Sequence, residues 1–140
     1  MRKNETVRVT VTDMNNLGYG VGHLDGMTVF VRGCVVGETV PAKVIKVTKS
    51  YLVALCEEVP EPSPNRCEPD CTSYPACGGC VYRHITYAHE LELKRSYVGN
   101  AFRKAGVAAT VRNVRTTGKT VAYRNKAQYP ILPDPKTGTP

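Results

Sequence analysis

The chain has 140 residues, 41% of them hydrophobic, with 8 Tyr, 2 Phe and no Trp, a composition that allows a folded core but favours small β units over one thick core. The absence of a run of about 18 apolar residues excludes a transmembrane helix, and the polar N-terminus excludes a secretory signal, so we expect a cytosolic protein with no membrane partner. The net charge of +7, from 19 basic and 12 acidic residues, favours a polyanionic partner such as RNA, with an ordinary soluble basic surface as the alternative.

The first sixty residues are predicted to be all-β. Val7, Val9 and Val11 alternate with polar residues and so belong to one face of a strand. Asp25-Gly26 is a strong hairpin signal. Five short strands of this kind predict a small closed β-barrel of the OB type over about residues 1–60. The strands are expected at residues 6–12, 18–22, 27–31, 39–47 and 51–56.

A proline-rich stretch separates the barrel from a cysteine-rich segment. Pro60, Pro62 and Pro64 force an extended backbone with few donors, so this stretch is a linker or an ordered arm. The linker and the cysteine cluster are together expected to occupy residues 61–85.

One clear helix is predicted over residues 86–106. Thr86 suits the N-cap, Gly106 suits the C-cap, and Glu90 and Lys94 are spaced to form an i, i+4 ion pair. Apolar residues recur at helical spacing and define one apolar face, made of Tyr87, Leu91, Val98, Phe102 and Ala105.

Strand patterns return after the helix, at residues 109–114 and 123–131. The final residues read as a strand that enters a hairpin turn without a returning strand. We therefore expect residues 86–140 to be the truncated start of a second, α+β domain. The predicted fold class is thus mainly β with one helix: a five-stranded OB-like barrel, a cysteine segment and the beginning of this domain.

The strongest chemical signal is a C-x5-C-G-G-C pattern formed by Cys71, Cys77 and Cys80. The intervening glycine pair permits the positive φ of a tight turn, and soft thiolates bind Zn²⁺ or iron–sulfur clusters. Cys67 completes a local set of four thiolates, which satisfies a [4Fe-4S] cluster and tetrahedral zinc equally well. Spacing alone does not separate the two metals. In a cytosolic protein such crowded cysteines indicate a metal site more strongly than disulfides.

Other reactive or aromatic residues have plainer interpretations. Cys34 and Cys56 lie in predicted barrel strands and are expected to be small core residues. His84 and His89 are expected on the surface or at the helix cap rather than as metal ligands. Tyr19 and Phe30 are candidates for stacking on an RNA base, and Tyr19 is the better of the two because it lies between two glycines.

Several motifs, taken in order, resemble the RNA uracil-5 methyltransferase family, and in particular its bacterial ribosomal-RNA members with an N-terminal TRAM domain. The likeness covers essentially the whole chain, and the Cys-Gly-Gly-Cys and Tyr-Arg-Asn-Lys blocks are its specific parts. The motifs are Pro62-Ser63-Pro64-Asn65-Arg66, residues 71–80, Tyr82-Arg83-His84-Ile85-Thr86-Tyr87, Leu91-Glu92-Leu93-Lys94 and Tyr123-Arg124-Asn125-Lys126-Ala127-Gln128.

The resemblance implies that the barrel is an RNA-binding TRAM domain. It implies that Cys71, Cys77 and Cys80 match three ligands of the family's [4Fe-4S] cluster, whose fourth ligand lies further downstream in the family. Cys67, which the family pattern does not require, is either a substitute ligand or incidental.

The resemblance further implies that the Tyr-Arg-Asn-Lys block begins a central RNA-binding domain. Arg124, Asn125 and Lys126 are its candidate RNA contacts, and alternation along the predicted strand places Arg124 and Lys126 on one face.

The family's catalytic domain, with its S-adenosylmethionine site, nucleophilic cysteine and carboxylate, is not matched here, and no catalytic residue is assigned. The expectation is the RNA-recognition and iron–sulfur portion of an S-adenosylmethionine-dependent enzyme that methylates carbon 5 of uracil in ribosomal RNA. On its own this portion is expected to be inactive. The alternative is a non-catalytic RNA-binding protein with a structural zinc or iron–sulfur site. A different TRAM-bearing enzyme, one that uses its cluster for radical chemistry, is disfavoured. Such enzymes typically place three cysteines as C-x3-C-x2-C, and the spacing in this chain does not fit that pattern.

Overall fold

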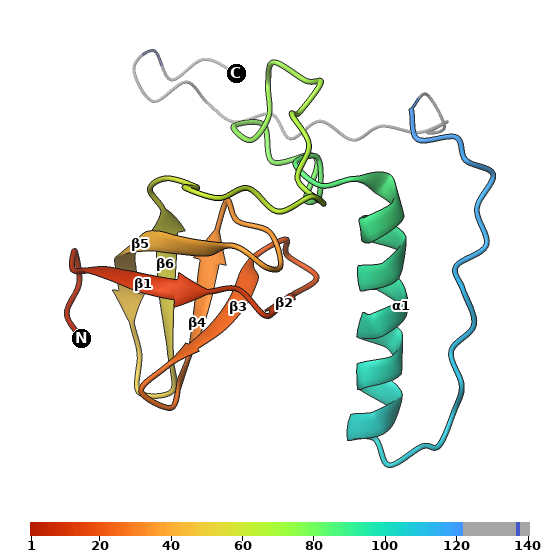
Figure 1. Cartoon of the computed structure of the whole chain (residues 1–140), viewed down its shortest axis with the longest axis horizontal. Helices are drawn as coiled ribbons and strands as arrows, with labels where there is room; N and C mark the ends of the chain where they lie inside the picture. The colour runs from red at the N-terminus through yellow and green to blue at the C-terminus, as the bar shows by residue number, and fades with distance from the viewer. Residues whose placement is uncertain (122–136, 138–140) are drawn as a thin grey trace.

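The computed structural model describes residues 1–121 and 137. A curled β-sheet lies beside one long helix, and the cysteine segment, residues 66–84, bridges them (Figure 1). The sheet has the order β1-β5-β6-β4-β3-β2, and all neighbouring strands are antiparallel except β4 and β6. This architecture confirms the predicted mainly-β class with a small barrel and a single helix. The strands are β1 (Thr6–Thr10), β2 (Asp13–Met14), β3 (Gly20–Leu24), β4 (Met27–Arg32), β5 (Thr39–Val47) and β6 (Tyr51–Cys56).

The predicted strands agree with the observed ones closely at β5 and β6 and less closely at β3. The glycine-rich strand expected at residues 18–22 begins two residues later, and the two-residue β2 was not expected. The predicted hairpin between β3 and β4 is confirmed, because Asp25 and Gly26 both have positive φ, of 49° and 78°. This pair of left-handed residues matches the type I′ turn whose twist suits an antiparallel hairpin.

The sheet curls so that β1 lies against β3 and the barrel approaches closure. The Thr12 N–H donates to the Val21 carbonyl across a distance of 2.8 Å. A Cβ atom on Gly22 would lie only 2.5 Å from a methyl group of Val9. Gly22 therefore lets the two strands approach, and this is the role that the glycine-rich sequence of β3 plays.

The barrel core is built mainly from valines that point inward from alternate positions. Val7, Val9 and Val11 are buried, as the alternation predicted, although Val11 lies one residue beyond the end of β1. Cys34 is fully buried, as expected for a small core residue, although it lies in the loop after β4 and not in a strand; burial raises the pKa of its thiol to about 12. Cys56 is half-buried and packs against this core. The other members of the core are Val29, Val31, Val40, Ala42, Val44, Leu52 and Ala54.

The helix α1 spans Tyr87–Lys104 and has clear caps at both ends. The Thr86 side chain accepts a hydrogen bond from the His89 N–H, which confirms the predicted N-cap. At the other end the C-cap is Ala105, one residue earlier than predicted, and Gly106 follows it with a φ of 71°. The Val107 N–H then donates to the Phe102 carbonyl, which completes a Schellman motif.

The predicted apolar face of α1 does not pack on the barrel. The buried helix residues are His89 and Leu93, and Leu93 joins a small core cluster with Met14, Val35 and Ile85. Val98 and Phe102, from the predicted apolar face, are 42% and 39% exposed. At 3.6 residues per turn, Val98 points about half a turn away from His89 and Leu93. The sequence predicted the apolar stripe, but apolar spacing does not say on which side of a helix a neighbour lies.

Residues 107–121 run back along the side of α1 away from the barrel (Figure 1). Arg95 donates to the Asn113 side chain, and the Tyr87 and Thr116 hydroxyls are 2.6 Å apart. The strand predicted at residues 109–114 is not found in this described stretch, which is extended without a pairing strand. Within residues 1–121 and 137, no helix has the length and apolarity needed to span a membrane. The strand predicted at residues 123–131 lies outside the described residues, as do Arg124, Asn125 and Lys126.

Candidate RNA interface and cysteine segment

Tyr19 and Arg32 form a stacked pair at one end of the barrel. The guanidinium carbon of Arg32 lies 5.6 Å from the centre of the Tyr19 ring, a distance at which a cation and an aromatic face attract each other. Tyr19 ends the loop before β3 and Arg32 is the last residue of β4. The pair combines a planar ring with a positive charge, which are the two groups that bind a base and its phosphate.

Asn15 holds the short loop that carries Tyr19. Its side-chain oxygen accepts hydrogen bonds from the N–H groups of Leu17 and Tyr19, each at 3.0 Å, and its own N–H donates to the Tyr19 carbonyl. Gly18 supplies the positive φ of 73° that the tight turn requires. The Asn15 side chain and Gly18 thus fix the loop, which presents Tyr19 in a defined position.

The pair continues into an aromatic and basic strip on the outward face of the sheet. The rings of Phe30 and Tyr51 meet edge to face with their centres 5.6 Å apart. Strand register places Arg32 opposite Leu55, and Leu55 opposite Lys43. Because side chains alternate between the two faces of a strand, all of these residues point away from the valine core. We call Tyr19, Phe30, Arg32, Lys43 and Tyr51 the outward strip.

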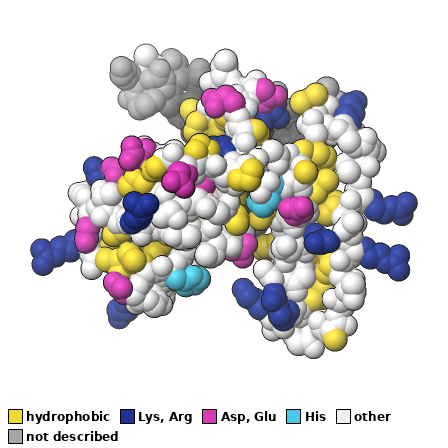
Figure 2. Space-filling view, viewed as in Figure 1, with side chains coloured by type: hydrophobic (Ala, Val, Ile, Leu, Met, Phe, Trp, Pro, Cys, Tyr) yellow, Lys and Arg dark blue, Asp and Glu magenta, His cyan; other side chains and the backbone are white. Residues whose placement is uncertain are grey.

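On the face shown in Figure 2, basic side chains are not gathered in one patch. On the face shown in Figure 2, Lys and Arg side chains project at the outer edges of the barrel and of α1, and acidic side chains lie between them. The net charge of +7 therefore favours binding of a polyanion, but it does not identify a binding surface. The outward strip is distinguished by its chemistry and not by charge density.

The cysteine segment is fixed to the barrel by a partly buried ion pair that sequence reasoning missed. Arg66 donates two hydrogen bonds to the Glu38 carboxylate, at 2.6 and 2.8 Å, and the same carboxylate accepts the N–H groups of Val35 and Ser63. Burial raises the pKa of Glu38, but the hydrogen bonds from Arg66 and these N–H groups outweigh it and leave the pKa below its usual range. A lone Glu beside a glycine turn gives no sequence signal for such a role.

His84 forms a second attachment between the segment and the barrel. Its Nδ1 lies 2.6 Å from the Tyr74 hydroxyl, and its Nε2 lies 3.3 Å from the Cys34 carbonyl oxygen. Burial lowers the pKa of His84. The expectation of a surface or capping role was wrong for His84 because the ring fills the gap between the cysteine turn and the barrel. His89 is likewise buried, in the first turns of α1.

The cysteines of the segment are free thiols on an open turn. Cys67 and Cys71 are half-buried, and Cys77 and Cys80 are exposed. The Gly79 N–H donates to the Cys77 sulfur across 3.3 Å. In the stretch from Met1 to Val121, no three His, Cys, Asp or Glu side chains lie close enough together to hold a metal. Thiols are suitable ligands for a soft metal, but these side chains are not close enough together in the described residues to enclose one.

Tyr74 and Arg83 are the ionisable side chains that neighbour the cysteine turn. Burial raises the pKa of Tyr74, and the charges of Cys80 and Cys67 raise it further. The pKa of Arg83 is raised mainly by its hydrogen bond to Asp70, with smaller contributions from Cys80 and Cys71. The side chains of Tyr74 and Arg83 thus lie within electrostatic reach of three of the four predicted ligands.

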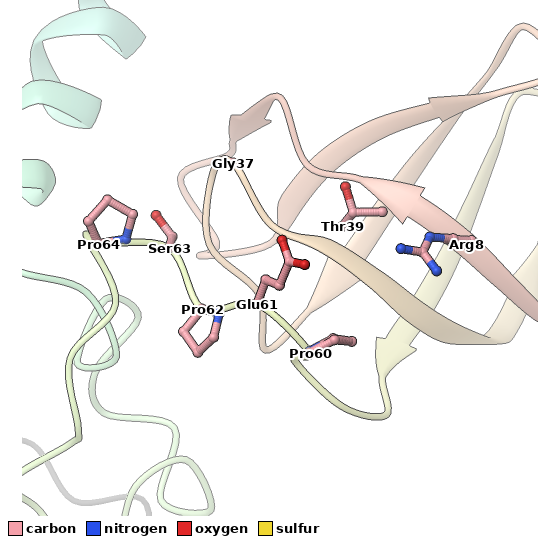
Figure 3. A pocket seen from close by; sticks show the side chains of 8 residues that line it. All are labelled: Arg8, Gly37, Thr39, Pro60, Glu61, Pro62, Ser63 and Pro64. Atoms are coloured by element: carbon pink, nitrogen blue, oxygen red, sulfur yellow. The ribbon is translucent and has the colours of Figure 1, made fainter.

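A small cavity lies elsewhere, between β1, the start of β5 and the proline-rich stretch (Figure 3). Its volume is about 210 Å³, below the range of roughly 300–1,000 Å³ typical of ligand sites. Arg8 and Glu61 are its charged side chains, and it contains no cysteine or histidine. Its lining therefore offers no arrangement for catalysis, and the outward strip and the cysteine segment remain the candidate sites.

Comparison with known proteins identifies the barrel. Residues 2–54 match the TRAM domain family, which covers the six strands except the last two residues of β6. This match confirms the expectation that the N-terminal barrel is a TRAM domain.

Similarity extends beyond the barrel to nearly the whole chain. The chain is 39% identical over 132 residues to an uncharacterized RNA methyltransferase of Clostridium tetani, and 38% identical over 135 residues to one of Clostridium acetobutylicum. Each match covers 94% of this chain and 29% of the relative, so the chain spans about three tenths of the length of these relatives. A tRNA (uracil-54, C5)-methyltransferase of Pyrococcus abyssi, solved with S-adenosyl-L-homocysteine, is similar over 71% of this chain and 21% of its own, with 24% identity and a TM-score of 0.47.

Proposed function

Because the chain belongs to the RNA methyltransferase family that its cysteine and Tyr123-Arg124-Asn125-Lys126 motifs resemble, we propose that it is the RNA-recognition part of a methyltransferase. The proposed enzyme uses S-adenosylmethionine to methylate carbon 5 of uracil in ribosomal RNA. The barrel of residues 1–60 binds RNA, residues 61–85 carry the cysteine site, and residues 86–140 begin a second RNA-binding domain. In that domain Arg124, Asn125 and Lys126 are the proposed RNA contacts.

The observation that carries the proposal is the outward strip of the TRAM barrel. Tyr19 and Arg32 present a ring and a cation 5.6 Å apart, and Phe30 and Tyr51 add two more rings on the same outward face. Base stacking on such rings contributes about 1–3 kcal/mol per base and tolerates different sequences. The strip is thus suited to an unpaired stretch of RNA.

The proposal is tested by the RNA affinity of the purified chain. Tyr19→Ala is expected to weaken binding of a labelled single-stranded, uridine-rich RNA by about tenfold, the effect of one lost stacking contact. Tyr97→Ala is the matched control, because Tyr97 is 52% exposed on α1, away from the strip. Fluorescence anisotropy measures both affinities. Equal affinity of Tyr19→Ala and the unsubstituted chain would contradict binding at the strip.

The salt dependence separates charge from stacking. The logarithm of affinity is expected to fall linearly with the logarithm of salt concentration, with a slope of about −0.7 per phosphate contact to single-stranded RNA. Arg32→Ala is expected to make this slope shallower by about one contact, and Tyr19→Ala is expected to leave it unchanged. A salt-independent affinity would contradict recognition of a polyanion.

We further propose that Cys71, Cys77 and Cys80 bind a [4Fe-4S] cluster, with Cys67 as the local candidate for the fourth ligand. The support is the set of free thiols, the N–H directed at the Cys77 sulfur, and the resemblance to the family that carries such a cluster. When bound, the cluster supplies a rigid inorganic centre that cross-links the turn. The residues of this chain supply its ligands and, through Arg66 and His84, attach that turn to the barrel.

Metal analysis of anaerobically purified chain tests this assignment. About four iron atoms per chain with broad visible absorbance are expected for the cluster. Cys77→Ser is expected to abolish the iron content, whereas Cys56→Ser, which changes a thiol packed on the barrel core, is expected to retain it. A colourless protein with one zinc per chain would contradict the cluster and would indicate a structural zinc site instead.

The proposed reaction requires a polypeptide as long as the relatives. Such a protein that contains this segment is expected to transfer a labelled methyl group from S-adenosylmethionine to carbon 5 of uracil in ribosomal RNA. Nucleoside analysis of the product identifies the methylated base. Label found only on another base, or on no RNA, would contradict the proposed substrate.

A further inference from the structure

The contacts between the cysteine segment and the barrel are concentrated on the loop that carries Tyr19 and on the turn that follows Arg32. We infer that residues 66–84 position the Tyr19–Arg32 pair for RNA, with Tyr82 as the principal positioning residue. The inference rests on the proposed function, because it concerns the same RNA-binding strip. It adds residues that do not themselves touch RNA.

Tyr82 and Val81 fix the loop that carries Tyr19. The Tyr82 hydroxyl donates to the Asn15 carbonyl across 2.7 Å, and Asn15 is the residue whose side chain holds the Leu17 and Tyr19 N–H groups. Val81 lies directly over Gly18, since a Cβ on Gly18 would stand 2.5 Å from the Val81 carbonyl oxygen. The loop is thus held at its first residue by a hydrogen bond and at its bend by close packing.

Arg66 and His84 fix the turn that follows Arg32. The Arg66 guanidinium, besides pairing with Glu38, donates to the Gly33 carbonyl across 2.9 Å. The His84 ring lies against the next carbonyl, that of Cys34, at 3.3 Å. Two consecutive carbonyls immediately after Arg32 therefore bond to side chains of the cysteine segment.

The geometry of the pair depends on both attachments together. Tyr19 lies in the loop before β3, whereas Arg32 ends β4 and is paired with Leu55 of β6. The last pair in register between β3 and β4 is Gly20 and Val31, so strand pairing does not fix Tyr19 relative to Arg32. Contacts with residues 66–84 hold both the Tyr19 loop and the turn after Arg32. A shift of the loop or of the turn changes the overlap of the ring and the guanidinium, and so changes how a base and its phosphate are received.

Tyr82→Phe tests the inference because it removes one hydroxyl and keeps the ring. It is expected to lower the affinity for single-stranded uridine-rich RNA by about threefold to tenfold, in line with the loss of one positioning hydrogen bond. The slope of affinity against salt is expected to stay unchanged, because no phosphate contact is lost. Tyr97→Phe, which removes an exposed hydroxyl from α1, is the matched control and is expected to have no effect.

A double-mutant cycle separates positioning from a general structural effect. In a Tyr19→Ala background, Tyr82→Phe is expected to have no further effect on RNA affinity, because the residue that it positions is already gone. A Tyr82→Phe loss of the same size in both backgrounds would overturn the inference. Unchanged affinity of Tyr82→Phe, together with a loss in Tyr19→Ala, would also overturn it and would leave the proposed function standing.

A second variant keeps the test decisive if Tyr82→Phe fails to fold. Val81→Ala removes the methyl groups over Gly18 from a residue that is 42% exposed, so the fold is expected to persist. Val81→Ala is expected to lower RNA affinity when Tyr19 is present and to have no further effect in the Tyr19→Ala background. An effect that is absent, or equal in both backgrounds, would overturn the inference. No loss in Tyr19→Ala itself would instead contradict the proposed RNA site.

Discussion

The barrel and the cysteine segment are stabilised in different ways. The barrel buries a core made mainly of valines, with residues such as Val29, Val31 and Leu52 fully enclosed, and its strands form one hydrogen-bonded sheet. The segment of residues 66–84 has its cysteine turn at the surface and meets the barrel mainly through the polar side chains of Arg66, Tyr82 and His84.

The difference separates a self-sufficient unit from a dependent one. A core of apolar side chains is formed by the barrel sequence alone, since all its strands except β2 contribute to it. The segment has few apolar residues of its own to bury, so its conformation depends on the barrel and, as we propose, on a metal centre. Such a segment is able to change its conformation while the barrel stays folded.

The largest effect is expected from the barrel core. Leu52→Ala removes a fully buried side chain and is expected to lower the free energy of unfolding by about 3–5 kcal/mol. Urea denaturation followed by circular dichroism measures the change. Leu17→Ala, at a position that is 60% exposed, is the control and is expected to change stability by less than about 0.5 kcal/mol. Equal effects would contradict the location of the core.

The next effect is expected from the ion pair that joins the two regions. Glu38→Gln keeps the shape of the side chain but removes its charge, and it is expected to cost about 2–3 kcal/mol because Arg66 then lacks its partner. The change is measured by urea denaturation. Glu57→Gln, at an exposed carboxylate, is the control. A larger loss for Glu57→Gln would show that the ion pair does not connect the regions.

Acid sharpens the same comparison. The folded-state pKa of Glu38 lies below its ordinary value of 4.5, so its contribution to stability is complete above that pH and is lost as the pH falls through the folded pKa. The stability difference between the unsubstituted chain and Glu38→Gln is therefore expected to shrink below about pH 4.5. Unfolding curves at pH 7, 4.5 and 3 measure it. A difference that stays constant would contradict the assigned ion pair.

The smallest effect on the barrel is expected from the cysteine turn. Cys77→Ser changes an exposed thiol and is expected to alter the stability of the barrel by less than about 0.5 kcal/mol, while it abolishes metal binding. Amide hydrogen exchange is expected to quicken in residues 66–84 and to stay unchanged in the strands. Loss of protection in the strands would show that the barrel depends on the segment.

The contrast also explains which features were predictable from the sequence. Period-two alternation predicted the strands and the core valines, and the Asp25-Gly26 pair predicted the hairpin, because each signal acts over a few neighbouring residues. Contacts such as Tyr82 to Asn15 join residues 67 positions apart and leave no local signal. The same limit applies to α1, whose apolar stripe was visible in the sequence while its direction relative to the barrel was not.

Backbone amide NMR shifts, measured during titration with single-stranded uridine-rich RNA, show whether the outward strip of the TRAM barrel receives RNA. The largest shift changes are expected at Tyr19, Phe30, Arg32 and Tyr51, with small changes along α1. Shift changes confined to the basic residues of α1, with the strip unaffected, would contradict binding of RNA at the strip.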